Sequence, residues 1–255
     1  MHTKESLMRD LERLGIDPHG TLFVHSSYKS IGDVDGRADT VLDALSEYMR
    51  DGLLALPAHT WSNVNTHNPV MDVLLTPVCV GILPELFRKR PGVLRSLHPT
   101  HSVAALGRDA AEFLAGEEHV TTPCPAGGVY HRLYTRGAQI LLIGVNFTRN
   151  TYIHGVEEWE HIPGTLTAGT QQLYVVDYEG RRHNTPQHRH CAPLISETFW
   201  KVEPVAIRDG ATIVGTFGDA KVFLSDARRL RDTVARIFSI DPAALMDNEP
   251  LDERF

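Results

Sequence analysis

His154 and Glu157 are the residues whose types and spacing point most directly to acid–base chemistry. They follow the apolar stretch 139–145 in a segment expected to enter a helix, where positions three apart share one face. A carboxylate beside an imidazole fixes its tautomer and stabilises its protonated form, as a general base that deprotonates a nucleophile requires. The pair therefore predicts a base catalyst. The alternative is a solvated helix face that carries Glu157, Glu158 and Glu160.

Two further segments could bind an anion. Residues 95–102, Arg95-Ser96-Leu97-His98-Pro99-Thr100-His101-Ser102, place several donors on a proline-constrained loop. Arginine offers a planar set of N–H donors that suits phosphate. The polar loop 26–32 follows a short apolar strand, and backbone N–H groups in such a loop can also hold an anion. It has neither a Walker motif nor G-x-G-x-x-G, and a plain polar loop is the alternative for both segments.

Four metal-capable side chains, His183, His188, His190 and Cys191, form another candidate group. They could supply zinc ligands, but a tetrahedral site usually combines closely spaced ligands with a second, distant set. We therefore assign no metal and expect an exposed, histidine-rich loop. No G-x-S-x-G motif of a serine hydrolase is present, and Cys124 is expected to be a packed thiol and not a nucleophile.

The composition is that of an ordinary globular protein, with 255 residues, 25 Lys+Arg, 32 Asp+Glu and 14 His. The formal charge of −7 argues against nucleic-acid binding, which needs an excess of Lys and Arg. Apolar runs such as 140–145 are too short to cross a bilayer, so we expect no membrane partner. The first 15 residues lack the features of a signal peptide, and the three cysteines are widely separated. These features predict a cytoplasmic protein.

Strands at 21–25, 52–57 and 139–145 alternate with helical segments, which favours an α/β architecture. Segment 139–145 is apolar on both faces and is predicted to be central, so the polar residues after it would lie where ligands bind in open α/β sheets. Residues 58–77 show no usable period and predict a long irregular loop. One domain over residues 1–255 is expected. Within it, 172–205 could form a small appendage, made of a hairpin over 173–184 and a helix over 194–201.

Taken in order, several stretches resemble the aminoglycoside N3-acetyltransferase family of antibiotic acetyltransferases. They are LFVHSSYKSIG (22–32), GLLALPAHTW (52–61), PVCVGILPELFRKRPGVLRSLHPTHSVAALG (77–107), ILLIGVNFTRNTYIHGVEE (140–158) and, more weakly, GDAKVFLSDARRLRD (218–232). The resemblance implies a three-layer α/β/α fold with a mixed central sheet, distinct from the GNAT fold. It also implies direct transfer of an acetyl group from acetyl-CoA to an amine, without an acyl-enzyme. His154 would be the general base, Glu157 would orient it, and Thr151 would lie near the reacting carbonyl.

The same resemblance assigns the cofactor side. Ser27, Tyr28, Lys29, Ser30 and Ile31, together with Arg95 and Ser96, would hold the pantetheine and phosphate parts of CoA. Ser102 is a further candidate, and His98 would either lie near the thioester or brace its own loop.

The expected acceptor is a cationic small molecule such as an aminoglycoside, modified at its 3-amino group. The acidic balance suits a polycation, and we expect a cleft rimmed by carboxylates. Those residues are Asp33, Asp35, Asp72, Glu117, Glu157, Glu158 and Glu160. Acylation of a different amine, a metal-dependent hydrolase and a homodimer stay open as alternatives.

Overall fold

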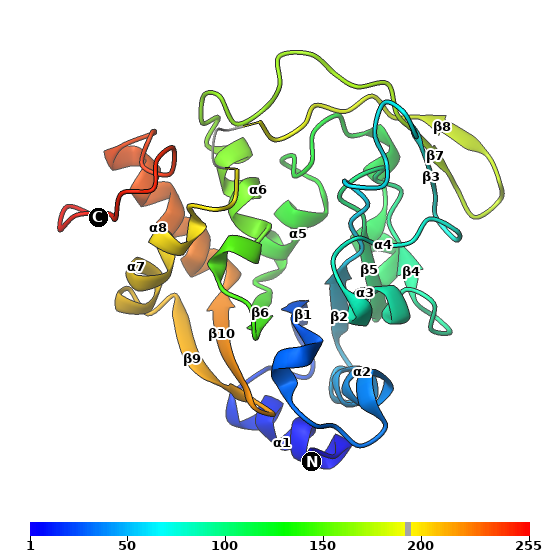
Figure 1. Ribbon diagram of the computed structural model, residues 1–255, viewed down its shortest axis with the longest axis vertical. Coiled ribbons are helices and arrows are strands. Elements are labelled where there is room, and N and C mark those ends of the chain that lie inside the picture. Colours follow the sequence, from blue (N-terminus) through cyan, green and yellow to red (C-terminus); the bar gives the residue numbers. More distant parts are fainter. Residues whose placement is uncertain (192–194) are drawn as a thin grey trace.

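The computed structural model describes residues 1–191 and 195–255, and its centre is a seven-stranded sheet in the order β4-β5-β2-β1-β6-β10-β9 (Figure 1). Strand β1 runs parallel to β2 and β6, whereas β5, β4, β10 and β9 join by antiparallel pairing. The strands are β1 (Thr21–Ser26), β2 (Leu53–Pro57), β4 (Leu94–Arg95), β5 (Val103–Gly107), β6 (Gln139–Ile143), β9 (Thr212–Phe217) and β10 (Ala220–Asp226). The sheet is mixed, as predicted.

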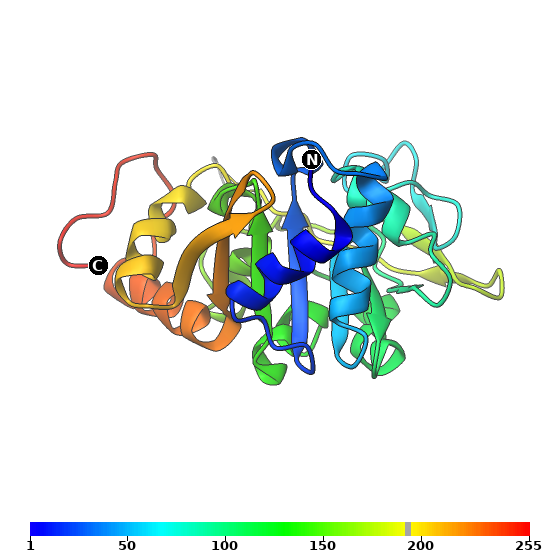
Figure 2. The ribbon, with the colours of Figure 1, turned by 90° about the horizontal axis from the view of Figure 1, so that it is seen from below.

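Helices cover both faces of this sheet, which gives three layers; Figure 2 shows α1 and α2 crossing one face. That face carries α1 (Lys4–Arg13), α2 (Arg37–Tyr48) and α3 (Ile82–Phe87). The opposite face carries α4 (Ala110–Leu114), α5 (Val129–Arg136), α6 (Tyr152–Trp159), α7 (Val202–Arg208) and α8 (Ala227–Ile240). Short 3-10 helices η1 (Tyr28–Ile31), η2 (Glu117–His119), η3 (Phe147–Arg149) and η4 (Phe199–Lys201) lie between the main elements.

The apolar strands explain the layers. Successive side chains of a strand point to opposite faces, so a strand buried on both sides is apolar at every position. In β6, Ile140 and Leu142 join the core under α5, α6 and α8, whereas Leu141 and Ile143 join the core under α1 and α2. Strand β6 therefore lies inside the sheet, as its sequence predicts.

A second, three-stranded sheet has the order β3-β7-β8. It contains β3 (Val70–Asp72), β7 (Tyr174–Val176) and β8 (Arg182–Asn184), and β7 and β8 form the predicted hairpin. The expectation of an irregular segment over 58–77 is wrong at β3, which pairs in parallel with β7 about a hundred residues later. The helix predicted over 194–201 begins at Leu194, outside the described residues; helical structure instead starts at Phe199.

The ends of β1 and β6 position the functional segments. Strand β1 leads through Ser26 into η1, and β6 leads through Gly144 into η3 and α6. Gly144 has φ of 62°, and a Cβ there would lie 2.3 Å from the Cβ of Ser30. Glycine at this position therefore lets the end of β6 pack directly against η1.

Candidate active site

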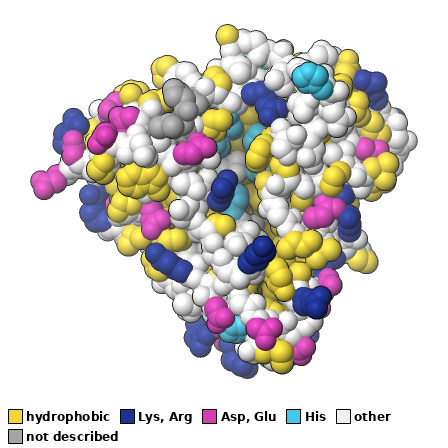
Figure 3. Space-filling model, in the orientation of Figure 1, with side chains coloured by type: hydrophobic (Ala, Val, Ile, Leu, Met, Phe, Trp, Pro, Cys, Tyr) yellow, Lys and Arg dark blue, Asp and Glu magenta, His cyan; other side chains and the backbone are white. Residues whose placement is uncertain are grey.

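A cavity of about 570 Å³ opens at the ends of β1 and β6, and Figure 3 shows cationic and histidine side chains around the hollow in this face. His25 and Ser26 line it from β1, while Thr148, Thr151 and His154 line it from the segment after β6. Val145 and Arg149 belong to the same segment after β6, and Pro57 ends β2. The other wall residues come from more distant segments: His59, Trp61, Cys79, Val80, His101, Arg189, His190, Ile195, Ser196 and Glu197. The cavity lies where the polar segment after a central strand predicts a ligand site.

His154 and Glu157 form a buried pair on α6. Nδ1 of His154 lies 2.7 Å from Oε2 of Glu157, and the side chains are 8% and 5% exposed. With Glu157 ionised, Nδ1–H donates to the carboxylate and Nε2 keeps its lone pair, the tautomer that a base requires. The predicted solvated helix face is therefore wrong for Glu157. Thr151, predicted to be near the reacting group, also lines the cavity.

Burial acts on both partners of this pair. It lowers the pKa of His154 to about 4, so the free imidazole is neutral near pH 7. Burial also raises the pKa of Glu157. The N–H that Glu157 accepts opposes that rise because it stabilises the carboxylate. A neutral imidazole beside a carboxylate can take up a proton from a bound nucleophile.

The position of α6 is fixed by packing. The Tyr152 side chain is fully buried, and its hydroxyl donates to the carbonyl of Ala227 over 2.7 Å. Asn146 caps η3 by accepting the N–H of Thr148. Trp159 packs over Gly155 so closely that a Cβ there would lie 2.7 Å from the indole. These contacts set the height and rotation of the helix that carries His154.

Five histidines line the cavity, and the sequence indicated a catalytic role for only one of them, His154. Nε2 of His59 lies 2.6 Å from the hydroxyl of Tyr130, and the ring of His101 lies 4.8 Å from that of His59. Nε2 of His25 is buried without a hydrogen-bond partner. The rings of His190 and His154 stack at 3.9 Å. These residues are scattered over 165 positions of the chain, so no local motif indicates the cluster.

The segment Ser27–Ile31 lies beside the cavity without lining it; its neighbours His25 and Ser26 do so. Tyr28, Lys29, Ser30 and Ile31 form η1, and Ile31 is buried in the core. The hydroxyl of Ser30 donates to that of Ser27 over 3.0 Å. Lys29 is exposed. This arrangement leaves the Lys29 ammonium free to meet an anionic ligand at the cavity edge.

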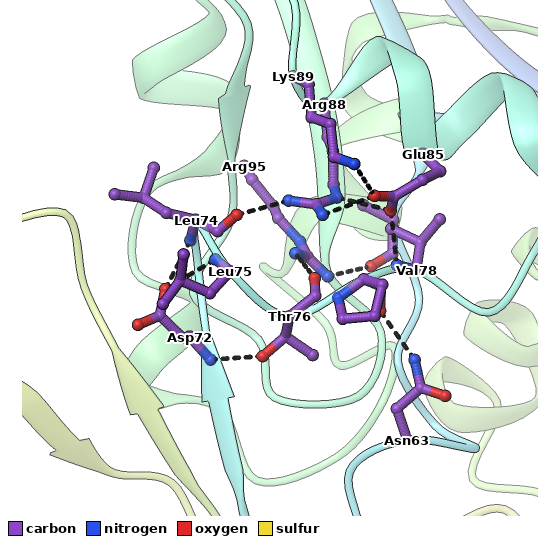
Figure 4. Close-up of polar contacts among 12 residues, drawn as sticks. Asn63, Asp72, Leu74, Leu75, Thr76, Val78, Glu85, Arg88, Lys89 and Arg95 are labelled. Carbon is purple, nitrogen blue, oxygen red and sulfur yellow. Dashed lines mark hydrogen bonds and ion pairs between the residues drawn. The ribbon is translucent and has the colours of Figure 1, made fainter.

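Arg95, predicted to bind the cofactor, does not line this cavity. Its guanidinium is buried and donates to the Ser102 hydroxyl and to the Ala58 carbonyl, over 3.0 and 2.8 Å. It also donates to the Thr76 carbonyl over 2.7 Å (Figure 4). Ser102 itself donates to the Ala58 carbonyl. Arg95 therefore links three segments of the chain, and its guanidinium N–H groups are bonded within the protein. An anion could bind only by replacing these bonds.

Ser96 and His98 are also used internally and do not line the cavity. The Ser96 hydroxyl accepts the N–H of Val103. Nδ1 of His98 accepts the N–H groups of Thr100 and His101, and its Nε2–H donates to the Thr122 carbonyl. Of the two roles considered for His98, this geometry supports bracing of its own loop.

The carboxylates expected to rim the cleft are placed elsewhere. Glu117 accepts the N–H of Val129 at the start of α5, and Glu160 pairs with Arg231. Among the described residues, the acidic side chain in the cavity wall is Glu197, which follows the residues left undescribed. None of the seven predicted acids is among the residues that line the cavity, so the prediction of an acidic rim is wrong.

The four metal-capable residues of the sequence do not converge. His183 pairs with Asp177, His188 contacts the Thr167 carbonyl, and the exposed Cys191 lies 3.6 Å from the Gly164 carbonyl. Only His190 of this group reaches the cavity. Its neighbours there are Glu158 and Cys124: in the described part of the chain, these three are the one set whose ligand-capable atoms lie within 4.8 Å of one another.

Cys124 and Glu158 belong to a hydrogen-bonded network. The Glu158 carboxylate accepts from the Thr122 hydroxyl and from the Cys124 N–H, over 2.6 and 2.8 Å. Burial raises the pKa of the Cys124 thiol, which disfavours the thiolate that a nucleophile needs. Cys124 is thus a packed thiol, as expected.

Comparison with known proteins identifies the family. A family model described as aminoglycoside 3-N-acetyltransferase matches residues 23–239. Aminoglycoside N(3)-acetyltransferase VII of Streptomyces paromomycinus is 30% identical over 195 residues, which are 69% of this chain and 67% of that protein. The YokD protein of Bacillus subtilis, described as similar to these acetyltransferases, is 31% identical over 61% of this chain and 64% of its own length.

Solved structures extend the likeness to nearly the whole chain. YokD from Bacillus subtilis superposes with a TM-score of 0.83 at 25% identity, covering 95% of both chains. AAC-IIIb, solved with CoASH, superposes with a TM-score of 0.81 at 23% identity, covering 94% of this chain and 97% of its own. These likenesses confirm the expected fold. A search of the described residues finds no helix long and apolar enough to cross a membrane. The chain belongs to the aminoglycoside 3-N-acetyltransferase family.

Proposed function

We propose that this protein transfers the acetyl group of acetyl-CoA directly to the 3-amino group of an aminoglycoside, with His154 as general base. The observation that carries the proposal is the buried His154–Glu157 pair at the wall of a 570 Å³ cavity. Family membership supplies the reaction, and relatives of the same fold have been solved with CoASH and with apramycin.

The proposed step balances without an acyl-enzyme. The amine nitrogen bonds to the acetyl carbonyl carbon, and the carbon–sulfur bond to CoA breaks. The amine loses a proton to Nε2 of His154, and the imidazolium returns that proton to the departing thiolate. Glu157 stabilises the imidazolium that forms on His154. The carboxylate therefore lowers the energy of the transition state in which this charge develops.

On the cofactor side, we assign the CoA phosphates to the edge formed by η1 and η3. Lys29 is exposed on η1, and Arg149 lines the cavity from η3. Ser27 and Ser30, which flank Lys29 in the chain, contribute two hydroxyls that bond to each other. Among the described lining residues, Glu197 is the carboxylate available to a cationic acceptor. Polar groups of both signs at one cavity fit an anionic cofactor and a cationic acceptor.

The test is release of free CoA thiol from acetyl-CoA across a panel of aminoglycosides, with the product mass measured. His154→Asn is expected to lower kcat by about 10²- to 10⁴-fold, the range for loss of a general base. His119→Asn is the matched control, because His119 is an exposed surface residue. Acetylated protein in intact-mass spectra after acetyl-CoA alone, or near-normal turnover by His154→Asn, would refute direct transfer by this base.

A second acceptor class is favoured by one observation. The cavity wall carries Arg149 and Arg189, but among the described residues only one acid, Glu197. An amine that bears its own carboxylate or phosphate would be attracted by this balance. The acceptor panel should therefore include such amines, and a higher kcat/KM for them than for every aminoglycoside would assign the enzyme to this second class.

Assembly and location are proposals as well. We propose a cytoplasmic enzyme, consistent with three free cysteines, and a homodimer, for which sedimentation analysis is the direct test.

A further inference from the structure

The His190 ring lies flat against the His154 ring. Their centroids are 3.9 Å apart and the ring planes differ by 18°. His190 comes from the segment after β8, some 36 residues beyond His154 in the chain. A side chain so placed contacts the whole face of the proposed base, which is a different contact from that of Glu157 at the ring edge.

Glu158 holds His190 in that position. Nε2 of His190 lies 3.0 Å from Oε1 of Glu158, and these side chains are 6% and 4% exposed. Because a carboxylate can only accept, Nε2–H is the donor. The carboxylate is itself fixed by the Thr122 hydroxyl and the Cys124 N–H. Consecutive glutamates of α6 thus bind two stacked imidazoles.

Phe199 closes a further side of the base. Its ring centroid lies 4.6 Å from that of His154, at an angle of 62°. Glu157, His190 and Phe199 therefore restrict both the tilt and the rotation of the His154 ring. An imidazole held by packing on more than one side stays aligned with its target, and misplacement by about 1 Å can cost 10²-fold in rate.

We propose that His190, held by Glu158, is a positioning residue for His154. It fixes the plane of the base by stacking, and a proton on either ring disfavours a proton on the other. This inference rests on the proposed function, since it assigns His190 a role in the same proton transfer.

The charge of the stack depends on the groups that face it. Glu157 and Glu158 approach from α6, and burial lowers the pKa of His190 to about 4. The His101 ring lies 5.4 Å from that of His190. Other titratable groups that face the two rings, among the described residues, are His59, His98, Cys124 and Glu197. The carboxylates favour imidazolium, whereas burial and the neighbouring imidazoles oppose it.

Two substitutions separate stacking from hydrogen bonding. His190→Phe keeps a flat ring but removes the donor to Glu158 and the charge. His190→Gln removes the ring but keeps an N–H donor. His188→Gln is the control, because His188 lies in the same segment and does not line the cavity. Folding of each variant is checked by its unfolding midpoint.

At about pH 8, we expect His190→Gln to lower kcat roughly tenfold or more with KM for acetyl-CoA unchanged, and His190→Phe to keep most of the wild-type kcat. The pKa of His154, measured by NMR on labelled imidazoles, is expected to rise in His190→Phe because the competing charge is gone. His188→Gln should match the wild type in both measurements.

Each contrary result has a distinct meaning. An unchanged kcat in His190→Gln together with an unchanged His154 pKa in His190→Phe would overturn this inference while leaving His154 as the base. Stoichiometric zinc in the purified protein that is lost in His190→Phe would also overturn it, by making His190 a metal ligand with Cys124 and Glu158. Active His154→Asn would instead refute the proposed function.

Discussion

Acidification should destabilise this protein through its buried histidines, and His98 is the clearest place to measure the effect. The His98 ring is fully buried, and burial lowers its pKa from 6.5 to about 4. Its Nδ1 accepts the N–H groups of Thr100 and His101, so a proton there would break both bonds. The folded state therefore binds this proton less readily than the unfolded state.

The sign and size follow from linkage. A histidine whose folded-state pKa is depressed contributes stability that is present above pH 6.5 and is lost as pH falls below that value. We take a His98 pKa of 6.5 in the unfolded chain and of about 4 in the folded one. The unfolding free energy then falls by ~1.4 kcal/mol between about pH 7.5 and 5.5. His25, whose pKa burial lowers to about 3, should lose a similar amount.

Buried acids act in the opposite direction. Burial raises the pKa of Glu117 to about 7, so its protonation on acidification favours the folded state by roughly 2 kcal/mol over the same interval. The dependence of the unfolding free energy on pH is therefore a sum of opposing contributions. The informative measurement is how much a single substitution changes that dependence.

The assay is urea unfolding followed by circular dichroism at several pH values. His98→Asn should flatten the dependence of unfolding free energy on pH by about 1.4 kcal/mol across this interval, because asparagine can accept the same N–H groups but does not titrate. His119→Asn, at an exposed site, should keep the wild-type slope. If the unfolding free energy of His98→Asn depended on pH as strongly as that of the wild type, the depressed pKa of folded His98 would be refuted.

Three further predictions concern single substitutions. Glu157→Gln should lower kcat by about tenfold or more, since an uncharged amide cannot stabilise the imidazolium of His154 as a carboxylate does. Steady-state kinetics should show this loss with an unchanged KM for acetyl-CoA, and an unchanged kcat would contradict the prediction. Glu197→Gln should raise KM for a cationic acceptor while leaving kcat near normal, and this rise in KM should shrink as salt is added. Equal KM values for the variant and the wild type at low salt would exclude Glu197 as an acceptor contact. Arg95→Met should cost roughly 3 kcal/mol of unfolding free energy, because the carbonyls of Ala58 and Thr76 and the Ser102 hydroxyl each lose a guanidinium donor. A rise in acetyl-CoA KM without loss of stability would instead restore Arg95 to the cofactor site.

Local sequence was sufficient for the features that depend on neighbours in the chain. Residues 140–143 are apolar at successive positions, which indicates a strand buried on both faces of a sheet. Placing His154 and Glu157 three residues apart on a helix determines that they meet. The resemblance to the family predicted the mixed sheet and the three layers, which the hydrophobic periodicity of the sequence does not indicate.

Tertiary structure decided everything that depends on distant partners. Arg95 looks like an anion-binding residue in its own loop, but the carbonyls of Ala58 and Thr76 lie close enough to use its donors. Strand β3 has only three residues and exists because β7 pairs with it. The stack of His190 on His154 joins segments that share no sequence pattern, and contacts of this kind follow from packing. The sequence by itself therefore determined the proposed catalytic pair and the central strand, whereas the fold decided which other polar residues face the cavity.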